Sequence, residues 1–510
     1  MDWLVDILSF IGAEILNVPA YLIGIITMLG LAALKKNTGE IIGGGIKSAM
    51  GFLILGAGAS VVVASLAPLG ELVLAITGSE GVVPTNEVIV AMATEQYGAN
   101  AAYVLVLGFL LMLVFARFTP LKYIFLTGHH LVFMSTMIVF VLSLGLGSGS
   151  DVLVVVIGSV ALAAILVAIP AFVTPFTKAI TGNDSMTVGH FGSLGYIAAG
   201  GIGAAVGKNS KSTEDIVFPQ GLRFLRDSLV STTLLMVVIY LVFGVWGAFA
   251  LPAADFIAIF GTETIASGLM AAFAQALQFG IGVAIILYGV RLVLGELIPA
   301  FQGIAKKYVP GAMPALDIPV VFPFAQNAVL IGFISSFIAG LLSLFLIALW
   351  FGPLWGLALI LPGMVPHFFT GGGAGVFGNA TGGRRGAVAG GFLNGILITF
   401  LPAFLMKVFD GLSAITGVEA IRGATFGDAD FGAVGIIMGG SMLVGGKVLS
   451  IILILVFLVV LVGGAWLFQV KLTNKGWVPG SAHRVFIEEE KAKTVAAAKA
   501  AKEAAAGKKA

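Results

Sequence analysis

Residues 152–174 read VLVVVIGSVALAAILVAIPAFVT and contain no charged side chain. A membrane hydrocarbon core about 30 Å thick is crossed by roughly 20 apolar residues in a helix, so this stretch predicts a transmembrane helix. Comparable runs recur along the chain, which is 59% hydrophobic and only 10% charged, with a mean hydropathy of +1.09. The sequence therefore predicts an all-α polytopic membrane protein.

The connections between the apolar runs alternate between basic and acidic. Lys and Arg cluster in connections such as Lys35-Lys36 and Arg384-Arg385, whereas residues 66–100 and 410–430 carry mostly acids. If basic connections are cytoplasmic, the chain starts outside and ends inside, which requires an odd number of crossings. The N-terminus has no basic n-region and no small-residue cleavage site, so we expect no cleavable signal peptide.

About eleven transmembrane helices fit this rule. They are expected near residues 10–34, 44–66, 101–116, 124–147, 152–174, 227–250, 266–288, 326–350, 352–369, 386–409 and 433–469. Three further apolar stretches, 67–100, 178–207 and 300–325, are rich in Gly or Pro and predict re-entrant hairpins that line a cavity.

This count divides the chain into two halves of five helices each. Residues 1–212 and 213–430 would have opposite orientations, as in the inverted repeats of secondary transporters. Residues 431–470 would form the eleventh helix, and residues 471–510 a charged cytoplasmic tail. The correspondence pairs His129 with His367 and the Pro84–Glu87 segment with Pro314–Pro319.

A few ionisable residues lie where lipid-facing residues would otherwise be expected. An ionisable side chain at membrane depth costs about 2.5 to 3.5 kcal/mol, so it normally faces a partner or a wet cavity. His129, His190 and Asp317 are therefore predicted to bind substrate, although histidines tied into helix packing are an alternative. His130 is expected to be a packing neighbour only.

Weaker candidates for the same site are Thr85, Asn86, Glu87 and His367. Thr85 and Asn86 could cap a half-helix whose N-terminus presents backbone donors to substrate oxygens. The glycine run after His367 indicates either a cavity lining or a tight turn between helices.

Several classes of chemistry are excluded or find no support. The chain has no cysteine, which rules out disulfides, thiolate metal sites and a cysteine nucleophile within it. Gly373–Gly378 matches a dinucleotide pattern without the surrounding βαβ unit, and no phosphate-binding loop or zinc-protease motif is present. We therefore expect no catalytic residue, no metal, no cofactor and no nucleic-acid partner.

An ordered set of motifs resembles the ascorbate-type IIC permeases of the bacterial phosphotransferase system. The set covers most of residues 10–470 and comprises Leu126–His129, Pro219–Ser228, Tyr288–Arg291, Gly295–Leu297, Ala315–Asp317, Ala325–Val329 and Gly375–Asn379. The resemblance implies a homodimer in the bacterial inner membrane, with eleven helices per subunit. It also implies translocation coupled to phosphorylation by a separate IIB subunit, whose phosphocysteine is charged from IIA.

The substrate implied by the resemblance is ascorbate or a related sugar or polyol. Phe133 and Phe191 stand where ascorbate members have glutamines, so two amide groups are replaced by aromatic rings. A site without those hydrogen-bonding groups discriminates its substrate differently. The alternatives are an ion- or proton-coupled secondary transporter of a small polar solute and, more remotely, a channel or structural membrane protein.

Overall fold

The computed structural model describes residues 19–77, 81–216, 228–421 and 423–480. Its first half contains α2 (Pro19–Ala33), α3 (Thr38–Thr77), β1 (Gly81–Pro84), α4 (Asn86–Phe118), β2 (Tyr123–Phe125), α5 (Gly128–Leu146), α6 (Asp151–Thr181), β3 (Thr187–Val188), α7 (Ser193–Val206) and the 3-10 turn η2 (Thr213–Asp215).

The second half begins with α8 (Ser228–Ala250), α9 (Ala253–Phe260), α10 (Ile265–Tyr308), β4 (Met313–Leu316), η4 (Ile318–Phe324) and α11 (Gln326–Leu346). It continues with η5 (Ile347–Phe351), α12 (Gly352–Trp355), β5 (Leu359–Ile360), α13 (Met364–Pro366), η6 (His367–Gly371), α14 (Gly372–Thr416), β6 (Ala424–Thr425), α15 (Ala429–Leu443), α16 (Lys447–Lys471) and η7 (Thr473–Lys475).

The described residues include eight helices long and apolar enough to cross a membrane, together with three shorter apolar helices. The chain is thus an all-α polytopic membrane protein, as its composition predicts. In the most apolar 18-residue stretch of α5, 89% of the residues are buried inside the molecule, whereas in that of α16 only 22% are buried. Helix α5 is therefore central, and α16 presents its apolar side chains to the surroundings.

Two predicted helices are corrected by the structure. Residues 352–369 do not form one helix, because Gly356 adopts a positive φ of 63° and the chain then enters strand β5. Residues 431–470 form two helices, α15 and α16, because Gly445 and Gly446 between them have φ angles of 134° and 59°. Such angles are accessible to glycine and end a right-handed helix.

The segments predicted as re-entrant hairpins each contain a short β-strand. Helix α3 extends beyond the expected boundary to Thr77, and β1 and α4 follow within residues 67–100. Strand β3 lies in 178–207 and β4 in 300–325. Each of these strands pairs with strands far away in the sequence: β3 pairs with β4, and β1 pairs with β5 and β6.

The six strands form two parallel three-stranded sheets whose members alternate between the halves of the chain. In one sheet the order is β5-β1-β6, so a strand of the first half lies between two of the second. In the other the order is β2-β4-β3, so a strand of the second half lies between two of the first. Each half therefore supplies the central strand of one sheet and the edges of the other.

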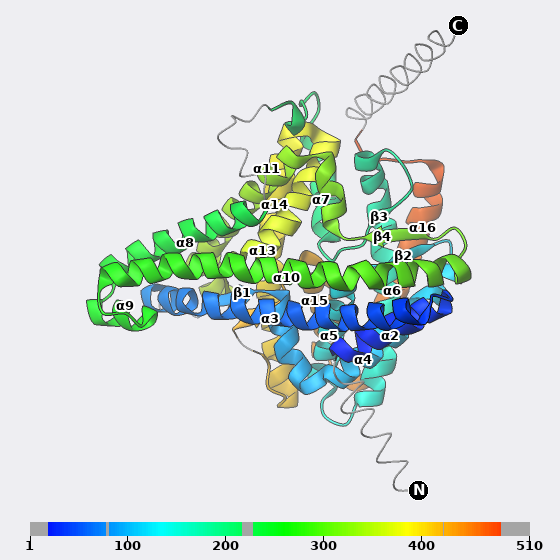
Figure 1. Cartoon of the computed structure of the whole chain (residues 1–510), viewed down its shortest axis with the longest axis horizontal. Coiled ribbons are helices and arrows are strands. Elements are labelled where there is room, and N and C mark those ends of the chain that lie inside the picture. The colour runs from blue at the N-terminus through cyan, green and yellow to red at the C-terminus, as the bar shows by residue number, and fades with distance from the viewer. Residues whose placement is uncertain (1–18, 78–80, 217–227, 422, 481–510) are drawn as a thin grey trace.

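Helices α3 and α10 run side by side across the molecule, while α6, α14 and α16 run at a steep angle to them (Figure 1). Helices α7 and α11 pack on α14 through glycines that allow backbone contact. A Cβ on Gly375 would meet Ala328 O at 2.2 Å, and one on Gly382 would meet Gly203 O at 2.1 Å. The glycines in these helices thus serve close packing.

Candidate functional site

The sheet β2-β4-β3 brings together three residues that the sequence places far apart. His129 lies in the first turn of α5 just after β2, His190 follows β3, and Asp317 follows β4. Because the strands are parallel, their carboxyl ends lie at the same edge. His129 Nε2 lies 3.9 Å from Asp317 Oδ2, and His190 Nε2 lies 3.9 Å from Asp317 Oδ1.

Backbone groups fix the orientation of these side chains. Asp317 Oδ1 accepts a hydrogen bond from the Ile318 N–H at 2.8 Å. His190 Nδ1 accepts one from the Gly192 N–H at 2.9 Å and lies 3.0 Å from the Tyr196 hydroxyl. With Nδ1 accepting, the neutral His190 ring carries its proton on Nε2, the atom that faces Asp317.

A second group of polar residues continues from the first. The His130 and His190 rings lie 3.9 Å apart, and His130 Nε2 lies 3.9 Å from Asp428 Oδ2. The Asn86 amide donates to Asp428 Oδ2 at 3.0 Å, and Asn86 Oδ1 accepts the Gly427 N–H at 2.9 Å. His130, expected to be only a packing neighbour, therefore links the two groups.

Asp428 and Asp430 were not predicted as site residues. The sequence groups them with an acidic external connection, yet each is only 3% exposed. Asp430 accepts the Leu194 N–H at 3.1 and 3.3 Å in the first turn of α7. Both carboxylates are thus built into the interior, Asp428 beside His130 and Asp430 at the start of α7.

A repeated sequence at the ends of β3 and β6 could have revealed Asp428. Thr187-Val188-Gly189-His190 and Thr425-Phe426-Gly427-Asp428 share the Thr-x-Gly pattern. Thr187 pairs with Ala315 in one sheet, and Thr425 pairs with Pro84 in the other. Asp317 lies two residues after Ala315 and Asn86 two after Pro84, so the pair His190–Asp317 corresponds to the pair Asp428–Asn86.

Aromatic rings enclose the imidazoles. The Phe133 centroid lies 5.6 Å from that of His129 and 5.9 Å from that of His130. Phe191 lies 5.5 Å from His130 and stacks on Phe125 at 4.9 Å. Both phenylalanines are buried, so they shape the site without adding hydrogen-bonding groups.

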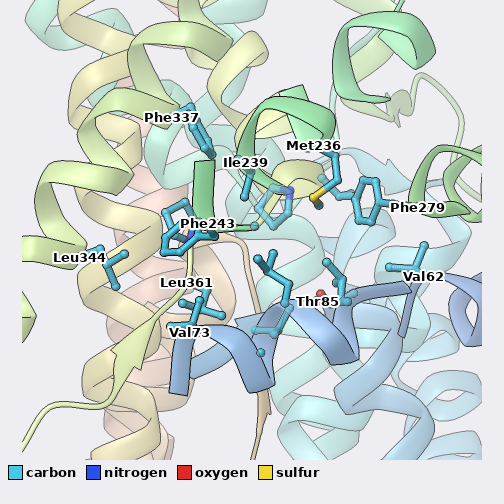
Figure 2. Close-up of a pocket in the computed structure, with 18 of the residues that line it drawn as sticks. Val62, Val73, Thr85, Met236, Ile239, Phe243, Phe279, Phe337, Leu344 and Leu361 are labelled. Carbon is cyan, nitrogen blue, oxygen red and sulfur yellow. The ribbon is translucent and has the colours of Figure 1, made fainter. Parts of the chain in front are cut away.

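Of the weaker candidates, only Asn86 belongs to these polar groups, through its bonds to Asp428 and Gly427. Thr85 occupies the N-cap position of α4 but makes no side-chain capping bond, and Asn86 is the first residue of that helix. Thr85 lines an apolar cavity where α3, α8, α10 and α11 meet (Figure 2). Glu87 lies in α4, and its side chain is outside the described residues.

His367 belongs to a separate buried polar group. Its Nδ1 lies 2.8 Å from the Ser336 hydroxyl, and Asn394 joins this group by donating to Thr370 at 2.9 Å. The glycines after His367 are not a turn, because they continue as a π-helical segment into α14. No contact with Asp317 or the other histidines is recorded for His367 among the described residues.

Two sets of side chains have ligand atoms close enough for a metal ion. They are His129, His130 and Asp317, and His130, His190 and Asp428. However, His130 Nδ1 accepts the Phe191 N–H at 3.2 Å, as His190 Nδ1 accepts that of Gly192. Their Nε2 atoms then carry the protons and offer no lone pair to a metal, so the hydrogen bonding favours donation to oxygen acceptors.

Comparison with known proteins identifies the family of the chain. The family model described as "PTS system sugar-specific permease component" matches residues 14–430. The chain is also similar to the ascorbate-specific PTS system EIIC component of Mycoplasma pneumoniae, with 26% identity over 76% of this chain. The match spans 65% of that relative's length. Since the family model covers most of the chain, including both groups of polar residues, the protein belongs to the family of PTS sugar-specific permease components.

Proposed function

We propose that this chain is a IIC permease that translocates ascorbate or a related sugar or polyol while a separate IIB subunit phosphorylates it. The observation that carries the proposal is the geometry around Asp317, whose carboxylate oxygens each lie 3.9 Å from an imidazole nitrogen. These gaps are too long for direct hydrogen bonds, and an oxygen atom between the two groups could bond to both.

The space between Asp317 and the imidazoles offers both a donor and an acceptor to a substrate hydroxyl. Asp317 accepts, His190 Nε2–H donates, and a hydroxyl can do both at once. The side chains of His129 and Asp317 are 16% and 22% exposed, which leaves them open to a ligand, whereas that of His190 is 4% exposed. Phe133 and Phe191 add apolar faces to this site and no hydrogen-bonding groups.

In the proposed phosphoryl step, the phosphoryl group comes from a phosphocysteine of IIB, because this chain has no cysteine to carry it. A substrate hydroxyl would attack the phosphorus of the IIB phosphocysteine, forming a P–O bond as the S–P bond breaks and the thiolate leaves. The hydroxyl proton needs an acceptor, and the Asp317 carboxylate, whose two oxygens face the imidazoles across this space, can take it. IIB, recharged from IIA, is a separate polypeptide in this proposal because this chain has no cysteine.

The same proposal includes two inverted repeats, residues 1–212 and 213–430, within about eleven crossings. The exchange of strands between the sheets and the correspondence of His190–Asp317 with Asp428–Asn86 support it. A homodimer in the inner membrane, an external N-terminus and a cytoplasmic C-terminal tail complete the arrangement. These last features rest on the resemblance and on the distribution of basic connections.

The proposal is tested by ligand-induced stabilisation of the purified protein. Ascorbate, pentoses, hexoses and polyols are compared, and we expect one class to raise the unfolding midpoint. Asp317→Asn should reduce that shift, because one of the two carboxylate acceptors becomes an NH2 donor and the negative charge is lost. An equal shift in the variant would place the ligand elsewhere.

A second function is favoured by one observation. Asp317, His190, His130 and Asp428 form a continuous run of ionisable groups, with imidazole–carboxylate distances of 3.9 Å at both ends. Such a run could relay protons in a proton-coupled secondary transporter. That function requires uptake to proceed without phosphoenolpyruvate and to stop when an uncoupler dissipates the proton gradient.

A further inference from the structure

A groove between α7 and α14 is apolar along its length and basic at one end. Its volume is about 680 Å³. Ile202 and Val206 of α7 line it on one side, and Val388, Phe392 and Ile396 of α14 line it on the other. Arg384 and Arg385 belong to the same lining, so the groove combines aliphatic walls with two cationic groups.

A break in the helical backbone of α14 at Gly383 positions the two arginines. Gly383 interrupts the helix with φ 57° and ψ −148°. A Cβ at Gly383 would lie 2.4 Å from Lys211 O, so the connection after α7 passes directly against this point. The Arg384 N–H donates to Lys211 O at 2.8 Å, and its Nε donates to Ser212 O at 3.1 Å.

The basic end of the groove lies where two apolar helices stop. Helix α7 ends at Val206 and is followed by Lys208 and Lys211, both exposed. The part of α14 after Gly383 begins with the arginines and continues as an apolar helix to Thr416. Basic residues at the ends of membrane-spanning helices are at headgroup depth, and apolar side chains further along are at acyl-chain depth.

The arginine charges are available to a ligand. Neither Arg384 nor Arg385 forms an ion pair with a carboxylate in the part of the chain that the structure describes. Glu214 lies in the same connection, but its Oε1 accepts the Asn327 and Ala328 N–H groups at the start of α11. Ser212 O occupies the Nε of Arg384, which leaves the two terminal nitrogens of the guanidinium to bond phosphate oxygens.

We propose that this groove binds an anionic phospholipid, with the phosphate on Arg384 and Arg385 and an acyl chain along Val206, Val388 and Phe392. The charge of the arginines and the length of the apolar walls favour this occupant over a soluble protein segment. The inference goes beyond the proposed transport function, and it holds whichever solute the chain carries.

The test compares two lipids on the purified full-length chain in detergent. Dioleoyl phosphatidylglycerol and dioleoyl phosphatidylcholine are titrated while the unfolding midpoint is followed. We expect phosphatidylglycerol to stabilise more, and Arg384→Gln/Arg385→Gln to weaken its apparent affinity roughly 30-fold, about fivefold for each arginine. Equal stabilisation by both lipids, or an unchanged preference in the double variant, would overturn the proposal.

Arg117→Gln is the matched control. Arg117 is an exposed arginine in the last turn of α4 and does not line the groove between α7 and α14. Its replacement should leave the lipid preference intact, whereas an equal loss would show that general surface charge explains the preference. If the double variant fails to fold, Arg385→Gln alone serves, because no hydrogen bond of its side chain is recorded among the described residues.

Labelling provides a readout that needs no arginine variant. Since the chain has no cysteine, Val388→Cys introduces a single thiol in the groove lining, and this thiol tests separately whether a second copy of the chain covers the groove. A photoactivatable phosphatidylglycerol should label peptides from α7 and the first turns of α14 after Gly383. A disulfide-linked dimer through that thiol would assign the groove to a second copy of the chain, and labelling confined to α16 would also contradict the proposal.

Discussion

Asp317 has one backbone donor, the Ile318 N–H at 2.8 Å, and faces two imidazoles across gaps of 3.9 Å. His367 is as buried as His190, but it bonds to Ser336 within a closed polar group. The surroundings of each ring, rather than burial, therefore separate a proposed ligand group from a packing group.

The two histidines should respond differently to the same substitution. His190→Ala removes the Nε2 donor, and we expect substrate affinity to fall about tenfold or more, in line with roughly 1–3 kcal/mol for an unpaired partner. His367→Ala should lower the unfolding free energy by a similar amount while leaving affinity nearly unchanged. Ligand titration and thermal unfolding measure the two effects, and an equal loss of affinity in both variants would contradict the assignment.

The Asn86–Asp428 pair allows a charge test. Asn86→Asp places a second carboxylate where the amide now donates to Asp428 at 3.0 Å. Two buried like charges repel, so we expect the unfolding midpoint to fall. Adding Asp428→Asn restores an amide–carboxylate pair and should recover most of the loss. Additive losses in the double variant would show that the two side chains do not interact.

Part of this site could be predicted from single residues. The sequence predicts His129, His190 and Asp317 as candidates because ionisable groups are costly at membrane depth. Asp428 and Asp430 were missed because a run of acids from residue 410 onward is also typical of an external loop. The Thr-x-Gly pattern before His190 and Asp428 carries the missing information, but only strand pairing shows that the two copies occupy equivalent places.

At the scale of elements, the glycines of α7, α11 and α14 decide how closely the helices pack. Gly375→Ala should be destabilising by about 1–3 kcal/mol, because the added Cβ would overlap the backbone of α11. Gly440→Ala in α15 is the control, since a Cβ there meets nothing within 4 Å and should be neutral or stabilising by about 0.5–1 kcal/mol. Thermal unfolding of both variants checks this, and equal effects would contradict the packing.

Helix boundaries were predicted less well than helix existence. The glycines after His367 are compatible with either a cavity lining or a turn, because glycine composition alone does not distinguish a turn from a tightly packed helix. The strands were not predicted, because segments of two to four residues have too few positions to show an alternating pattern. Both features depend on contacts with distant parts of the chain.

At the scale of the molecule, neither half can complete a sheet alone. Each three-stranded sheet takes its centre from one half and its edges from the other. If the chain is split within residues 217–227, the halves should resist proteolysis and copurify only when coexpressed. A first half that is equally resistant when expressed alone would show that the strand exchange contributes little to stability.

Class, family and the three main polar residues could be anticipated from the sequence, because apolar length and ordered motifs are local properties. The link between the polar groups could not, because His130 follows β2 of one sheet, whereas Asp428 and Asn86 follow β6 and β1 of the other. We expect substrate choice to depend on the same arrangement, because Phe133 and Phe191 lie beside the imidazoles.

The most direct test of the account is vectorial phosphorylation in vesicles that contain this chain and enclose IIB, IIA, the general phosphotransferase proteins and phosphoenolpyruvate. We predict that the labelled solute accumulates only as its phosphate ester, that accumulation requires phosphoenolpyruvate and withstands an uncoupler, and that Asp317→Asn abolishes it. Accumulation of unmodified solute without phosphoenolpyruvate, lost when the uncoupler is added, would contradict the account.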